Sequence, residues 1–354
     1  MKAIVTGGAG FIGSRVAEIL VERGHDVLVI DDLSGGFAEN IPAGARFVQT
    51  SVNANLQPVF DGFRPDHVYH LAAYAAEGLS HHIPLFNYTN NLTGTANVLA
   101  AAYRAGAAHF VFTSSIAAYG HPHSLNPFRE EDSCVPADPY GVAKLACENH
   151  IHAFRDYFSG PDFTIFRPHN VYGPAQNISD PFRNVVGIFM ARALRGEPLP
   201  LFGDGGQTRS FSYVRSVAAC IASAPFVEEA KNQVFNVGGD QPTSVRDLAH
   251  AIGRVLDVPV QLQFLPERKE VKHAHSSHDK LQRVFGAEAE DIPLEDGLQR
   301  MAVYVKSHPI PPATPCPSAI EIEDGLPPSW RNWLTVPVPA FPVSQTELRS
   351  QPAA

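Results

Sequence analysis

The stretch TGGAGFIG, residues 6–13, joins the apolar run AIV to an amphipathic segment that closes on Gly24. A short apolar run, a glycine-rich turn and an amphipathic segment predict a buried strand followed by a helix. Gly7, Gly10 and Gly13 fall in the turn. Such a turn bends tightly, lets a pyrophosphate approach the backbone, and directs the first amides of the helix at it. The stretch therefore predicts a dinucleotide site on a strand–helix unit.

The second apolar run, DVLVID, ends in Asp31, eighteen residues beyond Gly13. A carboxylate at this place accepts hydrogen bonds from the adenosine ribose, and the neighbouring Asp32 would repel a ribose 2′-phosphate. We therefore expect NAD rather than NADP. The third run ends in FVQTSVNA, so Ser51 and Val52 stand where folds of this type often present an acidic residue to adenine. Ser51 would hold the base more weakly.

Apolar runs and helical stretches continue to alternate after these, as in DHVYHLAA, NNLTGTANVLAAAYRAG and HFVFTSS. This alternation predicts an α/β fold, a Rossmann-type doubly wound parallel sheet with a smaller C-terminal α/β lobe. Eleven of the thirty prolines follow residue 307, together with both tryptophans, Trp330 and Trp333. We expect residues 318–334 to dock on the body and 335–354 to be disordered. The expected organisation is an NAD-binding domain (1–165, with a return segment near 210–240), a mainly substrate-binding lobe (166–307) and a Pro-rich tail (308–354).

The composition excludes several classes of partner. The net charge is −9 and no Lys/Arg-rich run stands out, so neither nucleic acid nor an anionic membrane is expected as a partner. The four cysteines are scattered singly, which argues against a disulfide framework or structural zinc and fits a reducing compartment. No charged leader precedes the first strand and no stretch is apolar enough to span a bilayer, so a cytoplasmic protein is expected. No segment places three of the sixteen histidines with carboxylate support, and no metal site is expected.

The stretch DPYGVAK, residues 138–144, places a phenol and an ammonium on one helical face, because Tyr140 and Lys144 are four residues apart. Alone, the pair could simply pack. Ser115, which ends HFVFTSS, and the nucleotide turn favour a reactive pair. Lys144 and a positive nicotinamide would lower the pKa of Tyr140 towards neutrality, so that Tyr140 could act as a base on a hydroxyl while Ser115 shares the hydrogen bond to the reacting oxygen.

Six motifs occur in the order seen in one family. The glycine turn is followed by HLAA, TSSIAAYG, DPYGVAK, RPHNVYGP and FGDGGQTRSFSYV, over about residues 1–285. The chain resembles the extended short-chain dehydrogenases/reductases, in the sugar-nucleotide epimerase/dehydratase branch, and most of all the UDP-galactose (UDP-glucose) 4-epimerases. The resemblance implies an NAD-dependent enzyme acting on a nucleotide sugar, and a homodimer built on the helices near residues 90–106 and 140–158. The apolar faces of those helices would equally suit burial within one chain.

The resemblance also implies roles for individual residues. The catalytic residues would be Ser115, Tyr140 and Lys144. The NAD contacts would be Gly7, Gly10, Phe11, Ile12, Gly13, Asp31, Ser51, Val52, Leu71, Ala72, Ala73, Tyr140, Lys144 and Pro168. The substrate contacts would be Ser115, Asn170, Asn184, Arg209 and Arg268, with a residue that gates the sugar pocket. Counting back from Lys280 puts Ala274 at that gate, whereas counting forward from Arg268 puts His275 there.

The subtype depends on the two positions after Ser115, which here are Ile116 and Ala117. In this branch the 4,6-dehydratases need an Asp–Glu pair there, the decarboxylases typically carry Glu at the second position, and the 3,5-epimerase/reductases use Cys. Ile and Ala cannot move protons, which favours 4-epimerisation with NAD recycled in place. Two alternatives stay open: another NAD-dependent sugar-nucleotide enzyme (a 4-keto reductase or an epimerase at another carbon), and a non-catalytic NAD- or sugar-nucleotide-binding scaffold. His169, where the family more often has Phe or Tyr, is either a packing residue or an added acid or base.

Overall fold

The computed structural model describes residues 1–121, 126–267, 272–308, 310, 316, 318–327 and 330. Arg268, Trp333 and the segment 335–354 that we expected to be disordered lie outside the described residues. None of the described helices combines the length and the apolar character needed to cross a membrane.

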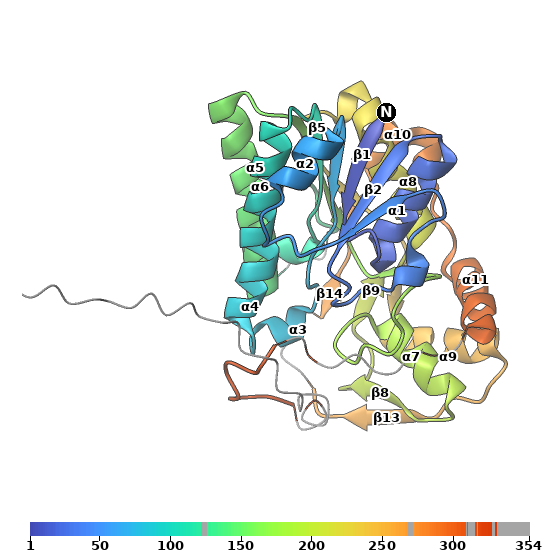
Figure 1. The fold of residues 1–354 in the computed structure, drawn as a ribbon. Coiled ribbons are helices and arrows are strands. Elements are labelled where there is room, and N and C mark those ends of the chain that lie inside the picture. Colours follow the sequence, from blue (N-terminus) through green and yellow to red (C-terminus); the bar gives the residue numbers. More distant parts are fainter. Residues whose placement is uncertain are drawn as a thin grey trace, which may run out of the picture.

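The centre of the molecule is a seven-stranded sheet in which every pair of neighbours is parallel. Its order is β11-β6-β5-β4-β1-β2-β3, and it fills the upper half of Figure 1. Its strands are β1 (Lys2–Thr6), β2 (Asp26–Asp31), β3 (Arg46–Gln49), β4 (His67–His70), β5 (His109–Thr113), β6 (Asp162–Pro168) and β11 (Gln233–Val237). The strand order reverses between β1 and β4, which is where such sheets bind ligands. The predicted doubly wound parallel sheet is confirmed.

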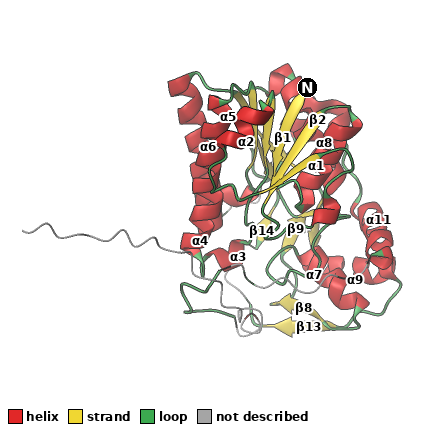
Figure 2. Cartoon of the chain, in the orientation of Figure 1, coloured by secondary structure: helices red, strands yellow, loops and turns green. Residues whose placement is uncertain are grey.

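Helices cover both faces of this sheet, as Figure 2 shows. α1 packs closely against α8 on one face, while α2, α5 and α6 cover the other. The helices are α1 (Phe11–Glu22), α2 (Gln57–Phe63), α3 (Glu77–Ser80), α4 (Pro84–Tyr88), α5 (Gly94–Arg104), α6 (Pro139–Phe158), α7 (Val185–Leu194), α8 (Val214–Ser223), α9 (Val245–Leu256), α10 (Asp279–Phe285) and α11 (Leu294–Ser307). Two apolar cores, one on each face, follow from this arrangement.

The start of α6 is fixed by its own sequence. The side chain of Asp138, the N-cap residue, accepts a hydrogen bond from the amide of Gly141 over 2.8 Å. Pro139 follows at the first helical position, where its missing N–H has no cost. Tyr140 and Lys144 then lie on the inward face of the first turns, and both are buried. The helix expected at this motif is confirmed.

A second lobe lies below the sheet in Figure 1, around α7, α9 and α11, with its own apolar core. Ser244 caps α9 by accepting a hydrogen bond from the amide of Asp247 over 3.0 Å. The lobe also holds short strands in small sheets. These strands are β7 (Val171–Tyr172), β8 (Leu199–Phe202), β9 (Thr208–Ser210), β10 (Ser212–Tyr213), β12 (Pro242–Ser244), β13 (Leu262–Leu265) and β14 (His273–Ala274). They pair as β10-β7, β12-β9-β14 and β13-β8.

The chain returns from the second lobe to the central sheet twice. β11 pairs with β6 at the edge of the sheet, and α8 joins the core on the α1 face. Leu281 and Phe285 of α10 belong to the same core. The two lobes are therefore linked by several crossings of the chain, which fix their relative placement around the carboxyl ends of the strands.

Candidate active site

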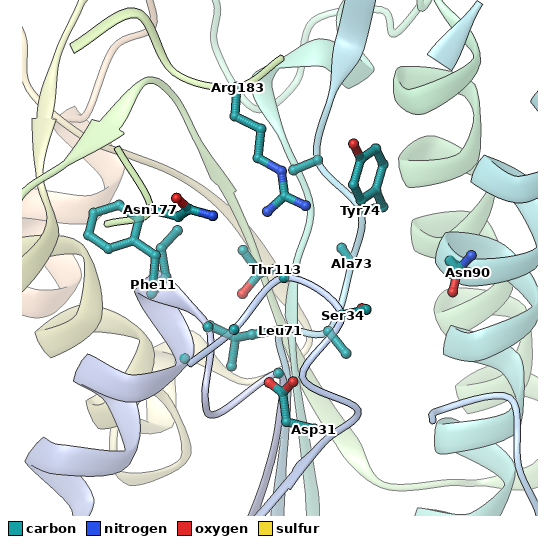
Figure 3. A pocket seen from close by; sticks show the side chains of 18 of the residues that line it. Phe11, Asp31, Ser34, Leu71, Ala73, Tyr74, Asn90, Thr113, Asn177 and Arg183 are labelled. Atoms are coloured by element: carbon teal, nitrogen blue, oxygen red, sulfur yellow. The ribbon is translucent and has the colours of Figure 1, made fainter. Parts of the chain in front are cut away.

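A cavity of about 350 Å³ opens at the carboxyl ends of the central strands. Because the strands are parallel, the segments that follow β1, β2, β4, β5 and β6 converge there. The cavity is lined by the glycine turn, the loop after Asp31, the segment after β4, the start of α6 and a segment of the second lobe. Figure 3 shows side chains from both lobes pointing into it.

The glycine turn leaves room for a phosphate group. α1 begins at Phe11, and its N-cap residue Gly10 offers no side chain to bond the first amides of the helix. Gly7 has a φ of +72°, and a Cβ there would lie 2.6 Å from the backbone nitrogen of Ala72. A Cβ on Gly13 would lie 2.1 Å from the carbonyl oxygen of Gly7. Only glycine fits both places, and the uncapped amides suit a pyrophosphate.

Asp31 ends β2 at the floor of the cavity, as the sequence predicted (Figure 3). Its carboxylate accepts hydrogen bonds from the amides of Ala9, over 3.0 Å, and Leu33, over 2.9 Å. Burial raises the pKa of this carboxyl, and the backbone hydrogen bonds act against that rise. Nearby, the hydroxyl of Thr113 is buried and has no hydrogen-bond partner among the described residues. An oriented carboxylate and an unpaired hydroxyl are groups that a dinucleotide would satisfy.

The structure brings Ser115, Tyr140 and Lys144 together. Ser115 follows β5, and its hydroxyl accepts a hydrogen bond from the amide of Ala117 over 3.1 Å. The side chain of Ser115 also acts on the phenol of Tyr140, whose pKa it lowers. The ammonium of Lys144 donates to the carbonyl of Thr113 over 2.8 Å and lies 5.7 Å from the centroid of the Tyr140 ring. All three residues line the cavity.

Burial dominates the electrostatics of Tyr140. Its pKa is raised, first by burial and next by the negative charge of Glu77. The hydrogen bond from Ser115 and the charge of Arg183 act in the opposite direction without cancelling the rise. Burial also lowers the pKa of Lys144 to about 8. Among the protein's own groups, desolvation of the phenol outweighs the charge of Arg183. That Lys144 and the positive nicotinamide together lower the pKa of Tyr140 stays a prediction.

A buried ion pair links the segments that carry Ser115, Tyr140 and Lys144. Glu148, one turn beyond Lys144 on α6, accepts hydrogen bonds from Nε of Arg167 over 3.0 Å and from Nη2 over 2.5 Å. The same carboxylate accepts a hydrogen bond from the hydroxyl of Ser114, the neighbour of Ser115. Both members of the pair are almost fully buried. Removing one partner would leave a buried charge uncompensated, so the pair locks α6 to strands β5 and β6.

Most of the predicted contacts line the cavity. They are Gly7, Gly10, Phe11, Ile12, Gly13, Asp31, Val52, Leu71, Ala72, Ala73, Ser115, Tyr140, Lys144, Pro168, Asn170 and Asn184. Ser51 does not line it; its hydroxyl instead accepts a hydrogen bond from the amide of Asn53 over 3.2 Å, and the neighbouring Thr50 takes its place in the lining.

Arg209, one of the residues proposed for the diphosphate, and the two candidates for the gate do not line the cavity. Arg209 on β9 donates to the carbonyls of Thr208, over 2.9 Å, and Lys272, over 3.1 Å, and does not line the cavity. Ala274 pairs with Arg209 where β14 meets β9, and neither Ala274 nor His275 lines the cavity. Arg268, as stated above, is not described.

The sequence analysis missed three prominent residues of the lining, Tyr74, Glu77 and Arg183. Arg183 pairs with Asp180, with 3.0 Å between Nε and Oδ2, and its guanidinium lies 4.5 Å from the centroid of the Tyr74 ring. Figure 3 shows its side chain reaching into the space beside Tyr74. These residues stand in the segment after β4 and in the loop before α7, where no motif or periodicity marks them. Only the tertiary fold brings them beside Tyr140.

His169 is held in a buried network outside the lining. Its Nδ1 is hydrogen-bonded to the carbonyl of Ser210 over 3.0 Å, and its Nε2 lies 3.0 Å from Nε2 of His278. Nδ1 of His278 pairs with the carboxylate of Asp240 over 2.5 Å. Burial lowers the pKa of His169 to about 3. These contacts match the packing interpretation of His169 rather than that of an added acid or base.

Within the described part of the chain, no three His, Cys, Asp or Glu side chains are grouped so that they could hold a metal ion. The four cysteines are all unpaired thiols.

An open glycine turn, an acidic residue at the end of β2 and a Ser–Tyr–Lys constellation over a parallel sheet define the site of a nicotinamide-dependent enzyme. The model of the NAD dependent epimerase/dehydratase family matches residues 3–238. The chain belongs to this family. Its cofactor is NAD, for which the glycine turn, Asp31 and Thr113 provide a fitting site.

The known relatives that match this chain include enzymes of more than one reaction type. The chain is 33% identical, over 317 residues, to UDP-glucose 4-epimerase of Mycolicibacterium smegmatis, a match that covers 87% of this chain and 99% of that one. It is 31% identical to UDP-glucuronic acid decarboxylase 1 of Arabidopsis thaliana, over 85% of this chain and 69% of the relative. Among solved structures, UDP-glucose 4-epimerase of Thermotoga maritima with UDP-glucose has a TM-score of 0.82 at 33% identity, covering 86% of this chain and 99% of that one.

Proposed function

We propose that this enzyme inverts the configuration at C4 of a UDP-hexose or a derivative of one, through a transient 4-keto sugar. The observation that carries the proposal is the convergence of Ser115, Tyr140 and Lys144 on the cavity, with Ile116 and Ala117 directly after Ser115. Relatives named as UDP-glucose 4-epimerases support the substrate class.

Each residue of the trio has a separate task in this proposal. The phenolate of Tyr140 accepts the proton of the C4 hydroxyl, and the resulting phenol returns it to the C4 oxygen after the sugar has turned in the cavity. Ser115 donates a hydrogen bond to the same oxygen and keeps it directed at the phenol. NAD, when bound, supplies the acceptor and the donor of hydride, so the reaction has no net redox change. Lys144, anchored on Thr113, holds its positive charge beside the Tyr140 ring and stabilises the phenolate.

The lack of a second proton carrier after Ser115 separates this proposal from the reactions of other family members. Elimination of water needs a group that protonates the leaving hydroxyl, and neither the Ile116 nor the Ala117 side chain carries an exchangeable proton. Ala117 stands where the decarboxylases of this family typically carry Glu, which argues against the reaction of the decarboxylase relative. Glu77 is the acidic side chain of the lining that acts on Tyr140. In this proposal its negative charge raises the pKa of the phenol.

We further infer that residues 1–165, with the return near 210–240, bind NAD, and that residues 166–307 mainly bind the nucleotide sugar. Asn170 and Asn184, which line the cavity from the second lobe, would contact the diphosphate. Four unpaired thiols support a reducing compartment, in keeping with a cytoplasmic enzyme.

We also infer a homodimer built on α5 and α6. Tyr103, Tyr157 and Phe158 leave 40%, 82% and 47% of their surface exposed, and the Tyr103 and Phe158 ring centroids are 5.7 Å apart. Exposed aromatic side chains that cluster on neighbouring helices are typical of an interface. Light scattering on the purified protein would test this: a monomer at micromolar concentration would contradict it.

The decisive experiment identifies the product of the reaction. The purified protein, without added NAD, is incubated with UDP-, GDP-, CDP- and dTDP-sugars, and the products are analysed by NMR and mass spectrometry. A C4 epimer of unchanged mass is expected from a UDP-sugar. It should be lost in Tyr140→Phe and kept in Tyr119→Phe, which removes a buried phenol bonded to Asn236 outside the cavity. A change of mass, or turnover only with supplied NAD(H), would contradict the proposal.

A further inference from the structure

The described part of the Pro-rich tail packs on the wall of the cavity that carries α3 and α4. Trp330 and Cys316 join Ala76, Leu79 and Ile83 in one buried apolar cluster. Only 9% of the surface of Trp330 is exposed. Tyr74 and Phe86, which pack against this cluster, also line the cavity. The tail and the cavity therefore share one thin wall.

Trp330 touches the neighbours of both charged residues of that wall. A Cβ on Gly78 would lie 3.2 Å from Cη2 of Trp330, and Gly78 directly follows Glu77. The rings of Phe182 and Trp330 meet edge to face, with centroids 5.4 Å apart, and Phe182 directly precedes Arg183. The indole thus lies between two segments that are about a hundred residues apart in the chain and that present opposite charges to the cavity.

Glu321 anchors the same tail on α4. Its carboxylate accepts hydrogen bonds from the amides of Leu85, over 2.7 Å, and Phe86, over 2.9 Å. α4 has no capping side chain of its own at Ile83. A carboxylate there satisfies two amides that would otherwise lack partners and complements the positive end of the helix. The amide of Glu321 also donates to the carbonyl of His82 over 2.8 Å.

α3 and α4 in turn hold the first residues of the catalytic helix. The hydroxyl of Ser80, at the end of α3, accepts a hydrogen bond from the amide of Tyr140 over 3.2 Å. The side-chain amide of Asn87, on α4, donates to the carbonyl of Pro139 over 2.9 Å. A continuous series of contacts therefore runs from the tail through two short helices to the residue proposed to move the proton.

We propose that the described part of the tail (316, 318–327 and 330) belongs to the sugar-binding end of the site, in which Trp330 and Glu321 are positioning residues that hold Glu77, Arg183 and Tyr140 in place. The proposal deepens the proposed function and rests on it for the identity of the substrate. Helices of four and five residues are too short to be stable alone. Without the tail, the wall of the cavity would lose the packing that fixes its charged groups.

The length of the tail equals the share of this chain that one relative leaves unmatched. The mycobacterial epimerase is matched over 99% of its own length by 87% of this chain. The unmatched share of this chain, about an eighth, is as long as the segment 308–354. A site element of this kind would adapt a common scaffold to one particular sugar.

Three variants test the proposal: Trp330→Ala, Trp330→Phe and Glu321→Gln. Trp330→Ala should raise KM for the UDP-sugar substrate and lower kcat, together costing about tenfold to hundredfold in kcat/KM, because loss of precise placement is expensive. Affinity for UDP alone should change by less than about twofold, since the wall faces the sugar and the catalytic helix. Trp330→Phe should restore most of the loss, because a ring still fills the space between Gly78 and Phe182. Glu321→Gln, which weakens one cap, should lie between.

Two outcomes of these assays would overturn the proposal. One is a Trp330→Ala enzyme with the kcat/KM of the native enzyme. The other is a parallel loss of affinity for UDP, NAD and the UDP-sugar that tracks a lower Tm, which would show that the tail only stabilises the fold. Trp333→Phe serves as a control for altering a tryptophan of the tail.

A second measurement does not depend on the reaction. The sequence holds two tryptophans, so the Trp333→Phe variant reports fluorescence from Trp330 alone. Titration with UDP-glucose or UDP-galactose should change its emission, whereas UDP should not, because only the sugar reaches the wall. If the emission of Trp330 does not change with either sugar nucleotide, the proposed role of the tail in sugar binding is contradicted. If the native enzyme forms no C4 epimer but the emission responds, the proposed function fails while the role of the tail stands.

Discussion

Lys144 and Tyr140 lie one turn apart on α6, and the ammonium nitrogen of Lys144 is 5.7 Å from the centroid of the Tyr140 ring. The ammonium donates its hydrogen bond to the carbonyl of Thr113, and only 3% of the surface of Lys144 is exposed. Burial lowers the pKa of Lys144 to about 8, so most of it still carries its charge at neutral pH. The fold therefore holds a desolvated cation beside a desolvated phenol, which is unfavourable for stability and useful for proton transfer.

The buried charge of Lys144 lowers the free energy of unfolding, and this effect should disappear as the pH rises and the ammonium loses its proton. The unfolded chain binds a proton at Lys144 up to its ordinary pKa of 10.5, whereas the folded chain releases it above about 8. Stability must therefore rise with pH in this window. Relative to Lys144→Met, the native protein should gain about 2 kcal/mol in unfolding free energy between about pH 7.5 and about pH 9.5. Urea unfolding of both proteins at each pH measures the difference. Parallel pH profiles would show that the ammonium is not desolvated.

Glu77 and Arg183 act on Tyr140 with opposite signs, and their variants should shift the pH–rate profile in opposite directions. Glu77 raises the pKa of Tyr140 and Arg183 lowers it. If the phenol must lose its proton to act as a base, Glu77→Gln should move the acidic limb of the profile of kcat/KM to lower pH. Arg183→Gln should move the same limb to higher pH. Initial rates across the pH range, at saturating NAD, measure both. Shifts in the same direction would mean that another group controls the limb.

The sequence predicted those parts of the site that are local in the chain. The glycine turn, Asp31 at a strand end and the Tyr140–Lys144 pair each follow from a few neighbouring residues and from the rule that parallel strands direct their carboxyl ends to one edge. Ser115 was also placed correctly, because it ends a strand of the same sheet. In each of these cases the same short stretch of sequence predicts both the helix or strand and the residue at its end.

What the sequence could not show depends on contacts between distant segments. The partner of His169 is His278, 109 residues further on, so its packing role was one of two open interpretations. Arg209 was expected at a diphosphate, but its donors go to backbone carbonyls where β9 meets Lys272. The direction in which the protein's own groups shift the pKa of Tyr140 could not be predicted, because charges are visible in a sequence whereas desolvation appears only once the chain has folded. Glu77 and Arg183 belong to segments without a regular pattern.

Asp31 should determine much of the affinity for NAD, and the chain offers a matched control beside it. Asp31 lies at the cavity floor and accepts two backbone amides, whereas Asp32, which also lines the cavity, is exposed and accepts one from Ser34 over 2.9 Å. Hydrogen bonds to a charged group contribute about 1.5–3 kcal/mol, so Asp31→Asn should raise the Kd of NAD about tenfold or more. Asp32→Asn should change it by less than about twofold. Calorimetry on the NAD-free protein compares them. Equal effects would remove Asp31 from the binding site.

Three buried histidines should make the protein sensitive to acid. Burial lowers the pKa of His70, His109 and His169 to about 3 each, and Nε2 of each ring bonds a neutral hydroxyl or another imidazole. In the unfolded chain these groups bind protons near their ordinary pKa of 6.5. Below that pH the unfolded state holds more protons than the folded state, so the stability present at neutral pH is lost as the pH falls.

Each histidine accounts for about 1.4 kcal/mol per pH unit below its unfolded pKa, so the three together should lower the unfolding free energy by about 4 kcal/mol between about pH 7.5 and about pH 5.5. That is a large share of the stability of an ordinary domain, about 5–15 kcal/mol. Urea unfolding should be measured at one saturating NAD concentration, because a ligand of the folded state adds its own stabilisation. His109→Gln should remove about a third of the part that these three histidines contribute, and His250→Gln, at an exposed position of α9, is the control variant. An equal pH dependence of the unfolding free energy in the two variants would mean that His109 is protonated in the folded protein and that burial does not keep it neutral.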